Sequence, residues 1–124
     1  MHKLPSPDLK WPIILDGVAL IAESENCFLK TYRCPAGVPT IGWGETQGVV
    51  MGMEWTQEQA DQKFCDSLTA SATEVLAALT VAPSEHELAA LTSFAYNCRG
   101  WKKSSVIKAH NRGDRTAAAN ALLL

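Results

Sequence analysis

The sequence ENCFLKTYRCPAGVPTIGWG, from Glu25 to Gly44, decides the fold of this chain. An apolar run at helical spacing ends close to Glu25. Pro35 to Gly37 then forms a turn, because proline fixes φ and glycine permits positive φ. β-branched and aromatic residues flank that turn and favour strands. We therefore predict a helix that ends in a small antiparallel sheet of two or three strands between residues 30 and 50, a geometry that holds polar side chains around a cleft.

Helical periodicity dominates the rest of the sequence. The first predicted helix begins at Ile13 and ends at Ser24 or Glu25. Its inward face is predicted to contain Ile14, Leu15, Val18, Leu20, Ile21 and Ala22. Thr56 starts a capping box, which predicts a long helix from Gln57 to Leu79. The apolar face of that helix is predicted to contain Ala60, Phe64, Leu68, Ala72, Val75, Leu76 and Leu79.

Three shorter helices are predicted to follow. A second capping box begins at Ser84 and opens a helix that ends near residue 100. Another helix starts at Ser104 or Ser105, and Asp114 caps an alanine-rich last helix. A short sheet followed by a run of helices indicates an α+β fold, with a mainly helical lobe joined to the sheet by the long helix.

Composition limits the classes of function. The chain has 124 residues, enough for one compact core, and 47% of them are hydrophobic. The formal net charge of -2 gives no basic field for nucleic acid, so no nucleic-acid partner is expected. The longest apolar run, Pro12 to Ala22, is too short to span a bilayer, and no targeting segment or stable membrane insertion is predicted.

The sequence also leads to predictions about the two ends of the chain and about the state of the cysteines. Residues 1–12 contain three prolines and are expected to form an extended lead-in to a domain over residues 13–124. The terminal Leu122-Leu123-Leu124 is either an apolar tail packed on the core or the mark of a truncated product, and truncation is favoured because exposed apolar patches are unusual. The four cysteines allow three pairings, but their irregular spacing favours free thiols.

Several kinds of site are excluded or left without support. The G-x-x-x-x-G spacing from Gly37 to Gly42 lacks the lysine and hydroxyl residue of a phosphate loop. The three histidines are scattered, so neither a metal nor a cofactor is expected. A Ser-His-Asp or Cys-His site remains open, because its members meet only in space, although no nucleophile elbow is present.

Glu25 with Cys34 and Thr40 is the strongest remaining candidate. A carboxylate at a helix C-terminus faces the negative end of the helix dipole, which raises its pKa and suits a proton donor. Tyr32 and Trp43 offer flat apolar faces suited to sugar rings, although such rings more often lie in the core. The alternatives are that Glu25 is a solvent-exposed charge and that Cys34 is an ordinary turn residue. The pattern suggests acid-assisted bond cleavage.

The spacing Glu25, eight residues, Cys34, five residues, Thr40 resembles the catalytic motif of phage-type lysozymes, the endolysins of glycoside hydrolase family 24. The segments Leu29 to Tyr32 and Thr40 to Gly44 are similar to the same region of that family. The similarity continues in three later segments: Ala89 to Asn97, Ser104 to Ile107, and Asn111 to Asp114. The resemblance covers roughly residues 13 to 124 and implies a lysozyme-like fold.

The resemblance also implies an activity and a set of site residues. It implies a muramidase of the EC 3.2.1.17 type, which hydrolyses the β-1,4 bond between N-acetylmuramic acid and N-acetylglucosamine. Glu25 would be the general acid, Thr40 would position the attacking water, and Cys34 would take the second catalytic place, where Asp is commoner. A Cys34 thiolate, assisted by Arg33, is one way to supply the missing charge. The residues implied to bind substrate are Tyr32, Gly42, Trp43, Gly44, Tyr96 and Asn97.

The resemblance implies bacterial cell-wall peptidoglycan as the partner of a monomeric enzyme. Such a protein would stay in the host cytoplasm until a holin or a phage tail brought it to the periplasm and cell wall. Family members usually continue for about 30 to 40 residues beyond this end, with an arginine that pairs with the catalytic Glu. A catalytically impaired lysozyme relative that binds peptidoglycan, or a truncated product, is therefore the alternative.

Overall fold

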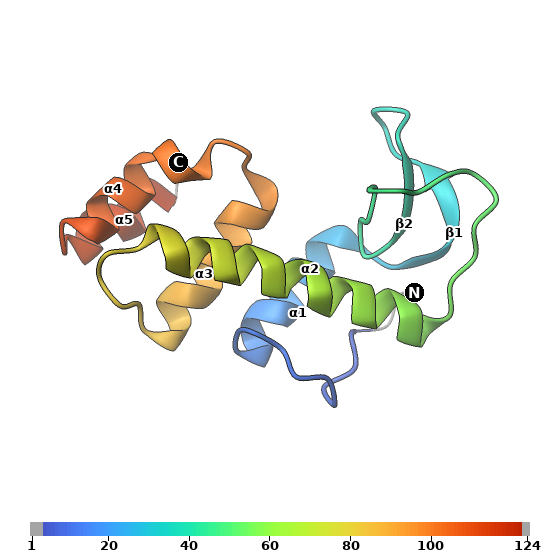
Figure 1. The fold of residues 1–124 in the computed structure, drawn as a ribbon, viewed down its shortest axis with the longest axis horizontal. Coiled ribbons are helices and arrows are strands. Elements are labelled where there is room, and N and C mark those ends of the chain that lie inside the picture. The colour runs from blue at the N-terminus through green and yellow to red at the C-terminus, as the bar shows by residue number, and fades with distance from the viewer. Residues whose placement is uncertain (1–3, 123–124) are drawn as a thin grey trace. The chain divides into compact units, whose positions relative to one another are not determined.

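A computed structural model describes residues 4–122 of the chain. The helices and strands follow the order α1, β1, β2, α2, α3, η1, α4, α5 (Figure 1). The chain divides into two compact units, Met1–Ser67 and Leu68–Leu124. The division falls within the 22-residue helix α2, Gln57–Ala78, so this helix contributes residues to both units.

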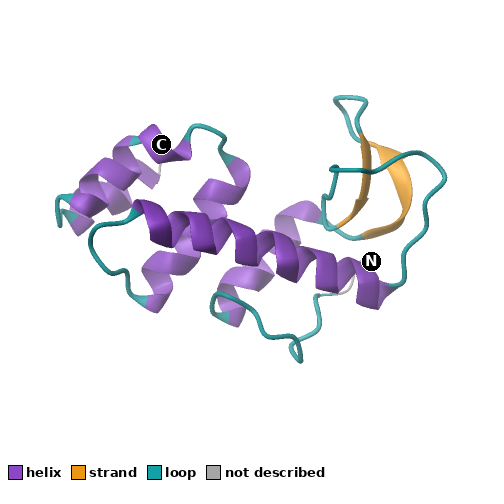
Figure 2. Ribbon diagram, in the orientation of Figure 1, coloured by secondary structure: helices purple, strands orange, loops and turns teal. Residues whose placement is uncertain are grey.

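The first unit contains α1 (Leu15–Glu25) and a two-stranded antiparallel sheet of β1 (Phe28–Arg33) and β2 (Pro39–Gly42), drawn in orange in Figure 2. Tyr32 pairs with Thr40 in the sheet register. Along the other edge of β1, Thr31 N–H donates to Met53 O at 3.0 Å and Trp55 N–H to Leu29 O at 2.8 Å. The sheet therefore begins before the predicted residue 30, and the possible third strand is only an isolated pairing.

Aromatic rings form the centre of the first unit. The rings of Trp43 and Phe64 stack with centroids 5.7 Å apart, and Trp11 packs its edge on Phe64 at the same centroid distance. Trp11 Nε1 donates to Ser6 O at 2.8 Å within the proline-rich lead-in, and Ser6 N–H donates to Asp61 Oδ2 of α2 at 3.1 Å, so the lead-in folds onto α2. Trp43 and Phe64 are fully buried, as expected for large apolar rings that stabilise a small core.

Capping boxes open the helices where the sequence predicts them. Gln59 N–H donates to Thr56 Oγ1 at 3.1 Å, and Thr56 N–H donates to Gln59 Oε1 at 2.8 Å. Ser84 and Glu87 make the same reciprocal pair at the start of α3 (Glu85–Asn97). Both boxes satisfy amide groups that the first helical turn leaves without partners, so both predicted helix starts are confirmed.

The second unit is entirely helical in the part that the structure describes. After α3 it contains the short 3-10 helix η1 (Trp101–Lys103), α4 (Ser105–Asn111) and α5 (Arg115–Leu122). Ser104 accepts from Ile107 N–H and Asp114 accepts from Ala117 N–H, which confirms the predicted start of α4 at Ser104 or Ser105 and the predicted Asp114 cap. Helix η1 was not predicted, because three residues carry no periodicity.

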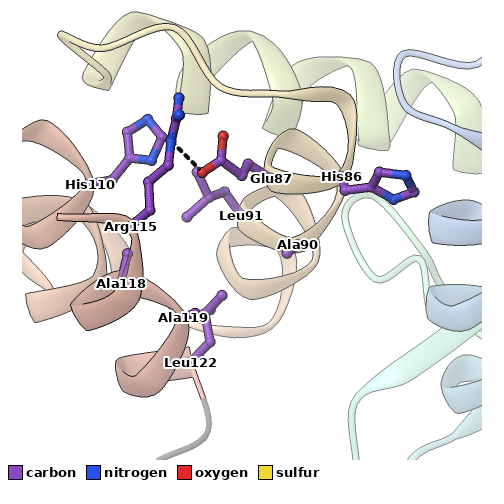
Figure 3. A pocket seen from close by; sticks show the side chains of 9 residues that line it. All are labelled: His86, Glu87, Ala90, Leu91, His110, Arg115, Ala118, Ala119 and Leu122. Atoms are coloured by element: carbon purple, nitrogen blue, oxygen red, sulfur yellow. Dashed lines mark ion pairs between the residues drawn. The ribbon is translucent and has the colours of Figure 1, made fainter. Parts of the chain in front are cut away.

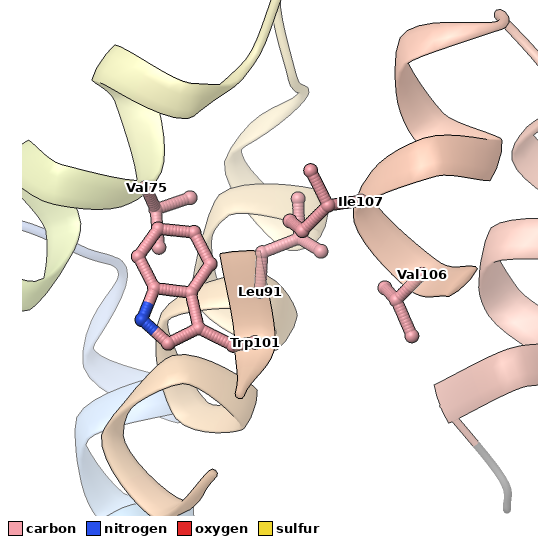
Figure 4. Close-up of a cluster of buried hydrophobic side chains, with 5 residues drawn as sticks. All are labelled: Val75, Leu91, Trp101, Val106 and Ile107. Carbon is pink, nitrogen blue, oxygen red and sulfur yellow. The ribbon is translucent and has the colours of Figure 1, made fainter. Parts of the chain in front are cut away.

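Five buried side chains form the core of the second unit (Figure 4). They come from four elements; Val75 and Leu91 lie beside the Trp101 indole, which is 6% exposed, and Ile107 points toward Leu91. The members are Val75, Leu91, Trp101, Val106 and Ile107. Their burial in one cluster explains why the apolar spacing of α2, α3 and α4 is conspicuous in the sequence.

Three predictions about inward faces are wrong. Leu15, Leu20 and Leu76 are 51%, 69% and 47% exposed. Helical spacing identifies an apolar stripe but not its width, so Leu15 and Leu76 fall at the edges of their stripes, and Leu20 falls outside the buried face of α1. The predicted fate of Leu123 and Leu124 falls outside the described residues.

Candidate active site

Glu25 is the last residue of α1, as the sequence predicts. The next residue, Asn26, has φ 57° and ψ 156°, a combination that costs energy for any residue with a side chain. Asn26 N–H still bonds Ala22 O at 3.1 Å, so the helix closes its last turn before the chain turns into β1. This abrupt exit fixes the direction of the Glu25 side chain relative to the strands.

The Glu25 carboxylate lies against the backbone of Gly44. A methyl group built on Gly44 would overlap Glu25 Oε2 and lie 3.2 Å from Glu25 Cδ. Gly44 also has φ +93°, which side chains disfavour. The predicted juxtaposition of helix end and glycine hairpin is therefore present, with Gly44 as the point of contact.

Burial raises the pKa of Glu25 above its ordinary value of 4.5. The direction agrees with the prediction, but the cause is loss of solvent under the hairpin rather than the helix dipole. A second carboxyl, that of Glu45, directly follows Gly44 in the sequence. Burial also raises the pKa of Glu45, and the charge of Glu25 adds to this effect. Glu45 Oε1 accepts a hydrogen bond from Ser67 Oγ at 2.8 Å.

Cys34 lies at the turn between the two strands. Hydrogen bonds from the backbone of Val38 and Ala36 hold the pKa of the Cys34 thiol below its ordinary value of 9.0. The predicted assistance from Arg33 is wrong, because Arg33 Nη1 instead donates to Gly37 O at 3.0 Å. Amide groups of a tight turn, rather than a neighbouring cation, favour the thiolate.

Thr40 is 4% exposed and pairs with Tyr32 across the sheet. Its hydroxyl donates to Val38 O at 2.9 Å, and it also reaches Cys34, where it helps to lower the pKa of the thiol. The predicted catalytic residues Cys34 and Thr40 are therefore neighbours. Because its ground-state acceptor is a backbone carbonyl, the hydroxyl must reorient before it can hold a water molecule.

Tyr32 lies close to both halves of the predicted site. Burial raises the pKa of its phenol, and the charges of Cys34 and Glu25 add to this effect. Its ring packs against Phe28 with centroids 4.3 Å apart. Phe28 is 42% exposed and was not among the predicted residues, although its four-residue spacing from Tyr32 places both on one face of β1.

Two predicted substrate-binding residues face the interior instead. The Trp43 ring is 0% exposed, and its indole nitrogen donates to Asp61 Oδ1 at 2.8 Å, so the prediction that it faces a sugar is wrong. A methyl group on Gly42 would lie 2.8 Å from Trp55 Cζ3. Gly42 is therefore needed for close packing against Trp55, and only Gly44 of the glycine pair faces Glu25.

Tyr96 and Asn97 belong to the second unit, at the end of α3. Asn97 is exposed and its side chain donates to Ser93 O at 3.0 Å. Their role in substrate binding stays a prediction.

Asp61, Gln57 and Ser67 on α2 were missed from the sequence, together with Glu45. Asp61 is only 4% exposed, yet it accepts three hydrogen bonds. Two signals could have found these residues. Asp61 interrupts the apolar face of α2 between Ala60 and Phe64, and Glu45 follows the glycine hairpin directly.

The second unit contains a pocket of about 210 Å³ (Figure 3). Its two opposite charges already pair, since Arg115 Nε lies 2.9 Å from Glu87 Oε2. Most of the remaining lining consists of alanine and leucine side chains. The pocket contains none of the predicted site residues.

Over residues 4–122, no cluster of three or more His, Cys, Asp or Glu side chains is arranged to hold a metal ion. Within the same span, each helix is too short or too polar to cross a bilayer. All four cysteines are free thiols, with Cys65 buried and the other three partly exposed.

The two-stranded sheet, the long helix and the helical second unit define a lysozyme-like α+β fold, which confirms the predicted fold class. An endolysin from Escherichia coli O157:H7 phage FAHEc1 has a similar structure, with a TM-score of 0.80 and 32% identity over 92% of this chain and 75% of that chain. The muramidase domain of SpmX from Asticaccaulis excentricus also has a TM-score of 0.80, with 28% identity over 90% of this chain and 78% of that one.

The family model described as phage lysozyme matches residues 22–124, so this chain belongs to the phage lysozyme family. The endolysin of Lactococcus phage c2 is 40% identical over 89 residues, which are 67% of this chain and 38% of that protein. The SAR-endolysin of Pseudomonas phage phiKMV is 36% identical over 111 residues, 89% of this chain and 68% of that protein. The chain thus spans well under half the length of the lactococcal relative.

Proposed function

We propose that this protein is a peptidoglycan muramidase, an endolysin that hydrolyses the β-1,4 bond between N-acetylmuramic acid and N-acetylglucosamine. The observation that carries the proposal is the Glu25 carboxyl, held against Gly44 with a pKa raised by burial. A carboxyl that keeps its proton toward neutral pH is the group that glycoside hydrolysis requires as general acid. Membership of the phage lysozyme family and the muramidase and endolysin names of its relatives support the same activity.

In the proposed reaction, Glu25 gives its proton to the glycosidic oxygen as the bond from that oxygen to the anomeric carbon breaks. The leaving sugar departs as an alcohol, and positive charge develops on the ring that remains. A water molecule adds to the anomeric carbon and loses a proton, which restores Glu25. Thr40 positions that water, and the Cys34 thiolate stabilises the positive charge, which suits a thiol whose pKa the turn amides lower.

Substrate binding is proposed to involve the first unit around β1. Tyr32 and Gly44 lie beside Glu25, and Phe28 extends the aromatic surface of the strand. Tyr96 and Asn97 are proposed to contribute from α3. The enzyme acts as a monomer, and a holin or phage tail brings it from the host cytoplasm to the wall.

The activity is tested on purified sacculi and on cells with a permeabilised outer membrane. Wild type should clear both, and mass spectrometry of the reduced products should show new N-acetylmuramic acid reducing ends. Glu25→Gln should lower the rate by about 10²–10⁴-fold, the range for loss of a general acid or base. Glu23→Gln, which neutralises an exposed carboxyl on the same helix, is the matched control and should clear at the wild-type rate.

A catalytically impaired wall-binding protein is the second candidate. The observation that favours it is Cys34, which is not a carboxylate, at the position where the proposed reaction needs a negative charge. Sedimentation with sacculi that yields no new reducing ends, in wild type and Glu25→Gln alike, would support binding without cleavage.

A further inference from the structure

Two chain segments next to Glu25 are tied to α2. The first is the exit from α1 through Asn26 and Cys27. The second is the hairpin that pairs Ile41 with Glu45 through two backbone hydrogen bonds of 2.9 Å and places Gly44 against Glu25. What keeps these segments together determines how well the carboxyl is covered.

The Asp61 carboxylate accepts three hydrogen bonds, of which those from Trp43 and Gln57 are called the ties below. Its Oδ1 accepts from Trp43 Nε1 at 2.8 Å and from Gln57 Nε2 at 2.9 Å. Its Oδ2 accepts from Ser6 N–H at 3.1 Å. A carboxylate that is 4% exposed and accepts three hydrogen bonds is held in one orientation.

Each tie leads to a neighbour of the site. Trp43 is directly followed by Gly44, and its ring is clamped on Phe64 of α2. Gln57 Nε2 also lies 3.6 Å from Cys27 Sγ, two residues beyond Glu25. The Asp61–Gln57 pair therefore holds the residue before Gly44 and the segment after Glu25 on one helical turn.

A role in stability alone would not require a charge here. Buried carboxylates are expensive to desolvate, and apolar replacements are often neutral or stabilising. A second Gln–Asp pair on α2 has the same four-residue spacing and serves for comparison. Gln62 Nε2 donates to Asp66 Oδ1 at 2.9 Å, but this pair is exposed, and its link to the hairpin is electrostatic: the charge of Asp66 helps to raise the pKa of Glu45.

We propose that Asp61 is a positioning residue, which holds Gly44 over the Glu25 carboxyl through Trp43 and so keeps that carboxyl covered. The proposal rests on the proposed role of Glu25 as general acid. Loss of the tie would let the hairpin lift and water reach Glu25, which would then release its proton at lower pH. Tyr32 and Glu45 also interact electrostatically with Glu25. Glu45 belongs to the same hairpin, so its negative charge would move away with Gly44, and this too would let Glu25 release its proton at lower pH.

The test compares Asp61→Asn, Trp43→Phe, the double variant and the control Asp66→Asn. Trp43→Phe removes the indole donor and part of the buried ring volume but keeps an aromatic ring at the position. It is the second variant on which the proposal can be tested if Asp61→Asn fails to fold. Turnover on solubilised glycan strands should fall by about 10-fold in each single variant, as expected for a small misplacement, with KM within about 2-fold. The double variant should be no slower than the slower single variant, because one tie is removed twice.

The second measurement is the titration of the Glu25 carboxyl, followed by carbon NMR with Glu25→Gln used to assign the signal. The midpoint should move to lower pH in both single variants, and the alkaline limb of turnover should move with it. Asp66→Asn should change neither. Folded Asp61→Asn and Trp43→Phe proteins with the wild-type midpoint and turnover would overturn the proposal and leave Asp61 as a core residue only.

The NMR readout separates this inference from the proposed function. If wild type cleaves no glycan but the Glu25 midpoint falls in both variants, the positioning role stands and the muramidase assignment fails. If Glu25→Gln abolishes cleavage while Asp61→Asn and Trp43→Phe leave the midpoint unchanged, the muramidase assignment stands and the positioning role fails.

Discussion

The carboxylate of Glu25 occupies the space that a side chain at Gly44 would need. These residues are 19 positions apart, and the contact joins the end of α1 to the hairpin after β2. It explains why the carboxyl loses solvent while the site remains open enough for a partly exposed thiol at Cys34. The absence of a side chain at Gly44 leaves room for the Glu25 carboxylate, and this is a reason for glycine here other than loop flexibility.

Gly44→Ala should therefore abolish most of the activity. The new methyl group would push the Glu25 carboxylate aside, and turnover should fall by about 10²-fold, the effect of a misplacement near 1 Å. Stability should fall by about 1–2 kcal/mol because φ is +93°. Gly48→Ala is the control for backbone strain, since Gly48 has φ +71° but a methyl group there meets nothing within 4 Å. It should lose similar stability in denaturant melts and keep its activity; equal losses of activity in both would count against the contact.

Stability should rise when Glu25 is neutralised, in the direction opposite to activity. A carboxyl whose folded pKa is raised binds a proton more tightly in the folded state, so its ionisation costs stability as pH rises above 4.5 and through the folded pKa. Glu25→Gln should melt a few degrees higher than wild type near pH 7, and the gain should vanish below about pH 4. Melting temperature measured across pH 3 to 8 checks this.

Glu45→Gln offers an internal comparison for that curve. Burial also raises the pKa of the Glu45 carboxyl, and the amide oxygen of the glutamine that replaces it can still accept from Ser67 Oγ. It should also gain stability near neutral pH. Glu23→Gln removes one negative charge from the exposed side of α1 and is the matched control for the change in net charge. A gain of equal size for Glu23→Gln would mean that net charge, rather than burial, sets the effect.

The sequence predicts the local parts of this structure well. Capping residues such as Thr56 and Ser84 bond within one helical turn, so their partners are fixed by spacing. The helix end at Glu25 is predicted for the same reason. Such features depend on three or four neighbouring residues and not on what lies across the fold.

The errors concern contacts between distant residues. Trp43 is a residue type that often binds sugars, but here its indole nitrogen donates to Asp61, 18 residues later in the sequence, and its ring stacks on Phe64. Arg33 adjoins Cys34 in sequence, yet it bonds Gly37 across the turn. In both cases a buried or turn-bound partner determines the direction of the side chain, and spacing along the chain does not reveal that partner.

The exit from α1 through Asn26 should be replaceable by glycine but not by alanine. With φ 57° and ψ 156°, Asn26 lies in a region that glycine enters freely and residues with a side chain avoid. Asn26→Gly should keep wild-type stability and activity, whereas Asn26→Ala should be less stable by about 1 kcal/mol. The free energies of unfolding of both variants are measured in denaturant. If Asn26→Ala is as stable as Asn26→Gly, the backbone at residue 26 is not strained.

Thr92 of α3 should be more stable as valine. Its side chain is 0% exposed, and among the described residues its hydroxyl oxygen has no hydrogen-bond partner. Replacement by a methyl group of similar size removes the cost of the buried hydroxyl, so Thr92→Val should gain about 1 kcal/mol in unfolding free energy. Thr73→Val is the control, because the exposed Thr73 hydroxyl donates to Thr69 O at 2.8 Å and has no such cost. A loss for Thr92→Val would point to a bound water at that position.

Cys34→Asp should retain or increase activity, and Cys34→Ser should lower it by about 10-fold or more. The turn amides lower the pKa of the thiol from 9.0, but Glu25 donates a proton only below its own folded pKa. The productive state needs protonated Glu25 with charged Cys34, and aspartate supplies that charge at much lower pH, since its usual pKa is about 3.9. The acid limb of turnover should therefore move to lower pH in Cys34→Asp, while the alkaline limb stays with Glu25.

The serine variant tests the charge from the other side. Serine cannot ionise in this range, so Cys34→Ser should lose the negative charge altogether. Cys98→Ser, in the second unit, is the control for loss of a thiol and should behave as wild type. Full activity in Cys34→Ser would show that the turn thiol has no part in the chemistry.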